Sequence, residues 1–379
     1  MEYLERSLEK VVLKYIKPGK AIVLTGARRT GKTVLLKKIM DLIPEECLLL
    51  NGEDFSVQEQ FVRRTTLNYQ SWLGNTRFLI VDEATEIPDI GKAIKLMLDT
   101  IPDLKVILSG SSYFDLVNKT GEPLTGRKHT FHLFPFSDQE LSSRFNPVDM
   151  QELLRHRMIY GSYPELFALP GNDEKTMYLR EIANSYLLKD ILAFENLKNA
   201  AKLKDLLRLL AYQVGNEVSL NELSRNLSIT RQTVERYIDL LSKVWVIFKV
   251  EPFSRNLRKE ISKSAKYYFF DNGIRNILIN NMEPPELRND TGQLWENLLI
   301  SERIKAQESK EMLVSNHFWR TYDQQEIDWI EDRNGKLFAY EMKWNPERQK
   351  RCPDAFSKSY PDAAYLVVSR DNYQEFLKS

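Results

Sequence analysis

The segment at residues 26–33, Gly-Ala-Arg-Arg-Thr-Gly-Lys-Thr, constrains this chain more than any other, because it matches the phosphate-loop pattern G-x-x-x-x-G-K-[ST]. Residues 21–25 before it are apolar and partly β-branched, which predicts a buried strand. Residues 34–40 after it carry apolar positions at helical spacing. A phosphate loop requires this strand–loop–helix context, since its backbone N–H groups and the helix N-terminus attract phosphate. The expected nucleotide-binding residues are Gly26, Ala27, Arg28, Arg29, Thr30, Gly31, Lys32 and Thr33.

Two side chains of this loop and a second motif have specific expected roles. Lys32 is expected to reach the β- and γ-phosphates of ATP, and the Thr33 hydroxyl to bind Mg²⁺. Residues 77–83 predict a strand that ends in two acids, of which Asp82 would hold Mg²⁺ directly or through water. Glu83 would polarise the attacking water as general base. The alternatives are a chance glycine turn and a strand that ends in solvated acids, and the pairing of the two motifs argues against both.

A further strand is predicted at residues 105–108, and it ends in Ser109-Gly110-Ser111-Ser112. A small polar residue at this strand tip is a candidate for contact with the γ-phosphate or the lytic water, and Ser109 or Ser111 fits that place. Strands that alternate with helices predict a doubly wound parallel sheet, with the nucleotide at the carboxyl ends of the strands.

Composition bounds the remaining possibilities. The chain has 379 residues, enough for roughly two to four domains. Its formal net charge is +1, so an affinity for nucleic acid must come from local patches. The cysteines, Cys47 and Cys352, form neither a disulfide framework nor a CxxC site, and the four histidines are scattered, which argues against zinc. The start of the chain does not have the pattern of a secretory signal, and no apolar run approaches the ~20 residues of a membrane span. Cytoplasm is the expected compartment, with no membrane partner.

The motifs of the first 145 residues resemble those of a known family. Gly126-Arg127 stands before a predicted strand that runs into Phe134-Pro135-Phe136. Together with the phosphate loop, the Asp-Glu strand and the Ser-Gly-Ser-Ser tip, this resembles the AAA-type ATPases of prokaryotes that carry an extra C-terminal domain. The resemblance implies an ATPase core over residues 1–145, an all-helical lid over 146–202, and a homo-oligomer such as a ring. It also implies that Arg127 reaches a neighbouring subunit's γ-phosphate. The alternative, given equal weight, is that Arg127 is a solvated charge or forms a surface ion pair.

Residues 203–255 predict helices, a tight turn, another helix and a strand, an order that looks like a winged helix-turn-helix. On its third helix Arg231, Gln232 and Arg236 are expected to point outward, where they suit phosphates and base edges. Between residues 225 and 266 there are ten Lys and Arg and four Asp and Glu. This local excess favours DNA, duplex or branched, as the partner. Winged helices also serve as protein-binding modules, which is the alternative.

Residues 256–379 carry a second group of acids. Asn334-Gly335 is a hairpin signal between predicted strands at 326–330 and 337–344. Side chains two apart in a strand share a face, so Glu341 and Lys343 point the same way, with Asp328 on the paired strand. Glu296, on a helix predicted at 293–307, could reach the same place. Such carboxylates can hold one or two divalent cations, with Lys343 positioning or activating a water for phosphodiester hydrolysis.

This order looks like the PD-(D/E)XK nuclease fold, especially the relatives of Holliday-junction resolvases. Glu296, Asp328, Glu341 and Lys343 match its four positions, with Glu-Ile-Asp where the nuclease label has Pro-Asp. Over nearly its whole length the chain resembles prokaryotic proteins that fuse an AAA-type ATPase to such a domain of unknown function. Buried carboxylates need a metal ion or Lys343 to compensate their charge. The alternative to a nuclease is a domain that kept this shape, with Lys343 as that compensation, and lost catalysis.

The expected fold is therefore α/β and multidomain. It would combine a P-loop AAA-type parallel-sheet core and helical lid (1–145 and 146–202) with a winged helix-turn-helix (203–255) and a restriction-endonuclease-like domain (256–379). Three functions follow: an ATP-driven enzyme that processes DNA, an ATP-dependent switch whose C-terminal parts bind protein or recognise DNA structure, and a ring motor that moves along DNA without cutting it.

Overall fold

The computed structural model describes residues 3–111, 124–186, 200–253, 264–321, 323–347 and 350–379. The chain divides into two compact units, Met1–Phe136 with Lys243–Trp245, and Ser137–Ser242 with Val246–Ser379. The first continuous stretch of the first unit thus ends at Phe136, before the predicted boundary at residue 145. Parts of the predicted lid (187–199) and of the predicted winged helix (254–255) lie outside the described residues.

The first unit is built on a five-stranded sheet, in which every neighbouring pair of strands is parallel. Its order is β2-β3-β4-β1-β5. The strands are β1 (Ala21–Thr25), β2 (Cys47–Asn51), β3 (Phe78–Asp82), β4 (Lys105–Gly110) and β5 (Lys128–His132). The predicted parallel sheet is confirmed. Strand β4 lies between β1, which leads into the phosphate loop, and β3, which ends in Asp82.

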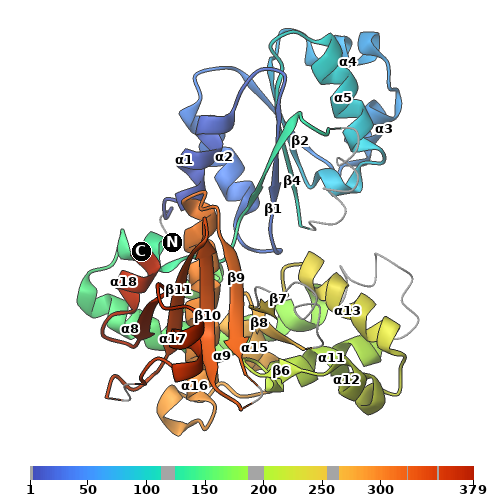
Figure 1. Cartoon of the computed structure of the whole chain (residues 1–379). Coiled ribbons are helices and arrows are strands. Elements are labelled where there is room, and N and C mark those ends of the chain that lie inside the picture. The colour runs from blue at the N-terminus through green and yellow to red at the C-terminus, as the bar shows by residue number, and fades with distance from the viewer. Residues whose placement is uncertain (1–2, 112–123, 187–199, 254–263, 322, 348–349) are drawn as a thin grey trace. The chain divides into compact units, whose positions relative to one another are not determined.

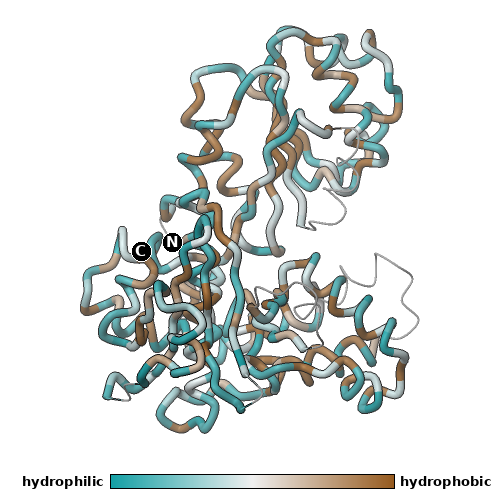
Figure 2. Tube along the Cα trace, in the orientation of Figure 1, coloured by the Kyte–Doolittle hydropathy of each residue, from teal (hydrophilic) through white to brown (hydrophobic). Residues whose placement is uncertain are grey.

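Helices cover both faces of this sheet, because its strands are apolar on both sides. Ile22 and Leu24 belong to a core with α1 (Ser7–Tyr15) and α2 (Lys32–Leu42). Ala21 and Val23 face the other way, into a core with α3 (Phe55–Val62), α4 (Thr66–Leu73) and α5 (Ile90–Thr100). Figure 1 shows the two groups of helices on opposite sides of the strands, and Figure 2 shows the hydrophobic strands between them.

The second unit is built on a seven-stranded sheet of order β12-β11-β10-β9-β7-β8-β6. The pairs β7–β9 and β11–β12 are parallel and the other four pairs are antiparallel. The strands are β6 (Glu217–Val218), β7 (Ile247–Pro252), β8 (Ala265–Phe269), β9 (Ser315–Arg320), β10 (Glu326–Arg333), β11 (Lys336–Met342) and β12 (Ala364–Val368).

Helices of the second unit surround this sheet. The longest of those described, α16 (Thr291–Ser309), is almost entirely buried and packs on β8 and β11. The other helical segments are α7 (Asp138–Ser142), α8 (Pro147–Tyr160), η2 (Pro164–Phe167), α9 (Asn172–Glu181), η3 (Ile182–Tyr186), α11 (Ala200–Tyr212), α12 (Leu220–Leu227), α13 (Arg231–Lys243), α15 (Asn272–Leu278), η4 (Pro285–Leu287), α17 (Asp354–Ser359) and α18 (Tyr373–Lys378). In the first unit a short η1 (Ala84–Glu86) follows β3. Across the described ranges, none of the helices combines the length and the apolar character that a bilayer crossing demands.

The predicted boundary between residues 255 and 256 falls between two strands, β7 and β8, that pair with each other. Strand β8 pairs antiparallel with β7, with Val250 opposite Lys266, and β7 continues the sheet through β9. All five residues of β8 are buried, and the strand lies between β7 and β6 in this sheet. The segments predicted as winged helix and as nuclease-like domain therefore share one sheet.

Candidate functional site

The phosphate loop lies between β1 and α2, as its pattern predicts. Gly31 immediately precedes α2 with a φ of 96°, a left-handed value that favours glycine. At Gly26 a Cβ would lie 2.2 Å from the carbonyl oxygen of Leu133, so any side chain would collide with backbone. Both glycines of the motif are therefore needed to build the loop.

Lys32 and Thr33 make contacts within and beyond the loop. The Lys32 ammonium donates to the carbonyl oxygens of Gly26 (3.0 Å) and Ala27 (3.1 Å), so it lies folded over its own loop. The Thr33 hydroxyl donates to Oδ2 of Asp82 at 2.6 Å. A hydroxyl and a carboxylate oxygen in contact beside a phosphate loop fit Mg²⁺, which prefers oxygen ligands and keeps several waters.

Asp82 and Glu83 are fixed by Ser109 at the end of the neighbouring strand. The fully buried Ser109 hydroxyl donates to Oδ1 of Asp82 and accepts the backbone N–H of Glu83 at 3.2 Å. This hydroxyl, predicted to contact the γ-phosphate or the lytic water, is thus found supporting the two acids. Burial raises the pKa of the Glu83 carboxyl, and the Lys32 ammonium opposes that shift.

Arg127 lies at the edge of the sheet opposite to the phosphate loop. Its carbonyl accepts the N–H of Ala21, the first residue of β1, at 2.8 Å. The phosphate loop follows the other end of β1, about 17 Å away for a five-residue strand. The guanidinium pairs with Asp99 of α5. The surface ion pair is therefore present within the subunit, and a role at a neighbouring subunit's nucleotide stays a prediction.

The predicted DNA-binding side chains lie on the outer face of α13. Arg231, Gln232 and Arg236 are exposed, whereas the apolar side chains of the same helix are buried. Arg231 donates to Glu235 at 2.9 Å. Of the ten basic residues between 225 and 266, those at 255–263 lie outside the described residues. Lys266 is buried and does not contribute to a surface patch.

The hairpin of the second unit brings together three of the four predicted nuclease-like residues. Strands β10 and β11 pair through the predicted Asn334-Gly335 turn, with φ values of 53° and 83°. Asp328 and Glu341 are buried, and Oδ2 of Asp328 accepts the N–H of Met342 at 2.8 Å. The Lys343 ammonium donates to Oε1 of Glu341 at 2.5 Å and lies 3.9 Å from Oδ2 of Asp328.

The fourth residue, Glu296, hydrogen-bonds to strand β8, and it still lies close enough to Asp328 and Lys343 to interact with their charges. Its Oε1 accepts the Tyr268 hydroxyl at 2.6 Å and lies 3.5 Å from the Lys266 ammonium. Lys266 also pairs with Glu326. Burial raises the pKa of the Glu296 carboxyl, and Lys266 offsets only part of that shift. Burial lowers the pKa of Lys266, but the neighbouring carboxylates raise it by more. The net effect is a pKa above the ordinary value for lysine.

The three predicted metal-binding carboxylates do not form one metal-binding group. In the part of the chain that the structure describes, no cluster of three or more His, Cys, Asp or Glu side chains is arranged to hold a metal ion. Glu296 pairs with Lys266. Asp328 and Glu341 remain, and Oε2 of Glu341 is buried with no hydrogen-bond partner from the residues that the structure describes. This donor set fits one divalent cation at most.

Several residues of these sites were not predicted. Arg6 contacts the phosphate loop, Lys266 and Tyr268 contact Glu296, and Lys350 donates to Oε1 of Glu341 at 2.7 Å. None belongs to a motif. A lysine among the aromatic residues of a short predicted strand is a weak signal for Lys266, since a lysine buried there needs an acidic partner.

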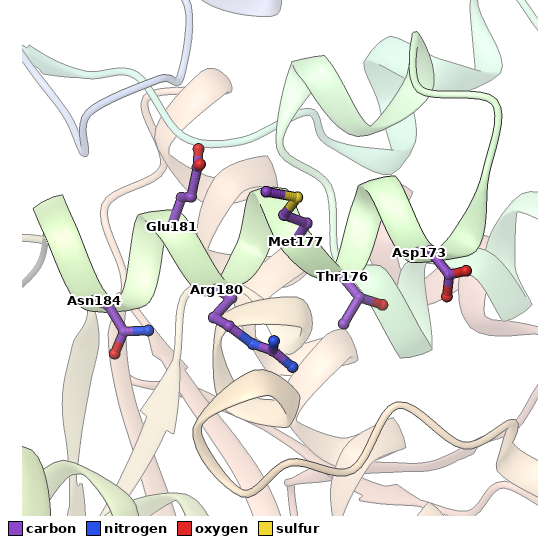
Figure 3. Close-up of a pocket in the computed structure, with 6 residues that line it drawn as sticks. All are labelled: Asp173, Thr176, Met177, Arg180, Glu181 and Asn184. Carbon is purple, nitrogen blue, oxygen red and sulfur yellow. The ribbon is translucent and has the colours of Figure 1, made fainter.

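A separate pocket lies along α9 and η3 (Figure 3). Its six lining residues are Asp173, Thr176, Met177, Arg180, Glu181 and Asn184. All six project from one continuous helical segment, and none was predicted as a functional residue.

The parallel sheet, the phosphate loop and the Thr33–Asp82 contact define the class of the first unit, a P-loop nucleotide-binding domain. Residues 18–142 match the model of the AAA domain. Residues 151–285 and 291–378 match two domains of unknown function, DUF8612 and DUF4143. The AAA domain supports ATP binding and hydrolysis by this chain.

Relatives of the whole chain carry no functional description. An uncharacterized protein of Mycobacterium tuberculosis is 24% identical over 327 residues, which cover 85% of this chain and 70% of the relative. One of Haemophilus influenzae is 23% identical over 380 residues, 94% of this chain and 88% of the relative. A solved structure that matches is a signal-transduction ATPase with a tetratricopeptide-repeat sensor, from Pyrococcus horikoshii. It is 14% identical, with a TM-score of 0.31, and the match covers 82% of this chain and 46% of the Pyrococcus chain. That score is too low to inform the assignment.

Proposed function

We propose that this ATPase is a DNA-binding protein that acts on duplex or branched DNA. The single observation that carries the proposal is the exposed row of Arg231, Gln232 and Arg236 on α13. A helix that presents such groups on one face, with its apolar face in a core, suits the major groove and the phosphates beside it.

The arrangement around α13 supports a winged helix. Elements α11, β6, α12, α13, β7 and β8 follow one another in this order, and the three strands lie in the order β6-β8-β7. Ser219 caps α12, and the turn to α13 passes through Ser228 with a left-handed φ of 54°. Two helices joined by a tight turn, with a β-hairpin after the second, are the parts from which a winged helix-turn-helix is built.

The nucleotide chemistry follows from the phosphate loop. On ATP binding, the Lys32 ammonium would exchange the carbonyls of Gly26 and Ala27 for phosphate oxygens, and Thr33 and Asp82 would hold Mg²⁺. The ion supplies charge neutralisation at the phosphates. Glu83 would accept a proton from water, and Ser109 holds Asp82 and Glu83 in place.

A binding panel tests the DNA proposal. Single-stranded, duplex, forked and four-way DNA would be titrated with the full chain, with and without Mg²⁺ and a non-hydrolysable ATP analogue. We expect duplex or four-way DNA to bind, and ATP turnover to change on its addition. A protein that hydrolyses ATP but binds none of these substrates at low salt would refute the proposal and leave a protein-binding switch.

A second candidate function is metal-dependent phosphodiester hydrolysis by Asp328, Glu341 and Lys343. It is favoured by Oε2 of Glu341, which is buried and has no hydrogen-bond partner among the described residues, whereas Lys343 and Lys350 both pair with Oε1 of the same carboxylate. A divalent cation would satisfy this second oxygen. Nicking of plasmid and branched DNA would be followed in Mg²⁺ or Mn²⁺. Glu341→Ala should abolish nicking and spare ATP hydrolysis. If the wild-type protein binds DNA without nicking it, the domain is catalytically silent, as in a ring motor or a DNA-recognition switch.

A further inference from the structure

Arg6 is a buried arginine between the phosphate loop and residues 133–136, which follow β5. It immediately precedes α1 and is 4% exposed. One guanidinium nitrogen donates to the carbonyl oxygen of Thr30 at 2.8 Å, and the other donates to that of Phe134 at 2.6 Å. The guanidinium also lies 4.9 Å over the ring of Phe136.

The hydrogen bond to Thr30 fixes the orientation of the Thr30–Gly31 peptide, whose N–H group would bind phosphate. In a planar trans peptide the C=O and the following N–H point in opposite directions. Holding the Thr30 carbonyl towards Arg6 therefore turns the Gly31 N–H away from Arg6, and this N–H belongs to the loop that cradles phosphate. The Thr30 hydroxyl donates to the Ala27 carbonyl at 2.9 Å, so both ends of this turn are held.

The contact with Phe134 fixes the segment that follows β5. Leu133 donates its N–H to Thr25 at 2.7 Å, and its carbonyl lies so close to Gly26 that a Cβ there would be 2.2 Å away. Phe136 is the last residue of the first unit before the chain continues into the second. The segment 133–136 is thus packed against the start of the phosphate loop and held by Arg6 at its end.

We propose that Arg6 is a positioning residue for ATP binding and that it couples the phosphate loop to the segment 133–136. Nucleotide that orders the Thr30–Gly31 peptide would order this segment through the two hydrogen bonds of one guanidinium. The planar fork of arginine can donate to two carbonyls at once, whereas the single ammonium of lysine cannot hold both in the same geometry.

The test uses the full chain and two readouts. Affinity for a fluorescent ATP analogue would be measured with Mg²⁺, and hydrogen exchange of peptides covering 26–33 and 133–136 with and without nucleotide. We expect nucleotide to protect both segments in the wild-type protein. Arg6→Lys should weaken affinity by about tenfold or more and remove the protection of 133–136 at saturating nucleotide, while 26–33 stays protected.

Two further variants keep the test decisive. Lys10→Met changes an exposed lysine just downstream on α1 and should behave as wild type. Phe136→Leu removes the ring beneath the guanidinium and keeps an apolar side chain, so it should reproduce part of the loss of affinity even if Arg6→Lys does not fold. Unchanged affinity and unchanged protection of 133–136 in either folded variant would overturn the proposal.

Discussion

The hydroxyl of Thr33 donates a 2.6 Å hydrogen bond to Oδ2 of Asp82, although 49 residues separate them. Thr33 lies in the first turn of α2, after β1, and Asp82 is the last residue of β3, with β4 between the two strands. All three strands are parallel, so their carboxyl ends meet at one edge of the sheet. This contact joins the two halves of the nucleotide site.

The first prediction concerns this contact. Thr33→Ala removes one expected Mg²⁺ ligand and should lower kcat for ATP at least about a hundredfold, because charge at the transferring phosphate is then less stabilised. Thr33→Ser keeps the hydroxyl and is the matched control. Turnover would be measured over a range of Mg²⁺ concentrations. Equal kcat values for the Ala and Ser variants would show that the hydroxyl takes no part.

The second prediction concerns Glu83. As general base it must be ionised, so activity should fall as the pH drops through its pKa. Burial raises that pKa, which moves the acid limb of the kcat profile above the pH of an ordinary glutamate. Glu83→Gln should lower kcat about 10²- to 10⁴-fold while ATP still binds. A variant that keeps wild-type turnover and the same acid limb would assign the base elsewhere.

The third prediction concerns Arg127. If it acts on a neighbouring subunit, specific activity should rise steeply with protein concentration, and Arg127→Ala should reduce kcat about 10³- to 10⁵-fold. Asp99→Ala removes the partner in the observed ion pair and is the control, because exposed pairs contribute only ~0–1 kcal/mol to stability. Loss of activity of the same size in both variants would instead indicate a structural ion pair.

The fourth prediction concerns α13. Replacing Arg231 and Arg236 by Ala should weaken DNA binding and reduce the slope of log K against log salt by about two, one for each lost phosphate contact. A double variant of two exposed basic residues elsewhere in the second unit, Arg155→Ala and Lys358→Ala, is the matched control. Should the two double variants show the same slope, α13 is not the DNA-binding face.

The fifth prediction concerns the buried pair of Lys266 and Glu296. Lys266→Met leaves a buried carboxylate without its cation and should destabilise the protein by about 3–5 kcal/mol near neutral pH. The pKa of Glu296 is already raised in the fold, so its ionisation lowers stability as the pH rises from the unfolded pKa through the folded pKa. Without Lys266 this loss deepens, and acid should partly rescue the variant.

Urea unfolding at pH 5.5 and pH 8 measures this effect. The double variant Lys266→Met with Glu296→Gln removes both buried charges and leaves only the partly exposed Glu326 without its cation, so it should recover most of the stability at pH 8. If Lys266→Met has the same stability as wild type at both pH values, the pair contributes nothing to the fold.

Local pattern predicted much of the fold. The phosphate loop, the apolar strand before Asp82 and the Asn334-Gly335 turn lie where the sequence places them. Each is set by backbone sterics and by side-chain periodicity within a few residues. The hairpin brings Asp328, Glu341 and Lys343 together for the same reason, because register across a two-residue turn is fixed locally.

Several contacts between segments that are distant in the sequence were not predicted, and only the tertiary structure shows them. Nothing around Glu296 indicates that a lysine from β8 neutralises it, and nothing around Arg6 indicates that it holds Thr30 and Phe134. Nor does the composition near residue 255 indicate that β7 and β8 share a sheet. The sequence by itself determined the strand–loop–helix of the nucleotide site, since short-range geometry leaves few alternatives. Only the tertiary structure decided which buried charges meet, because that depends on how whole layers pack.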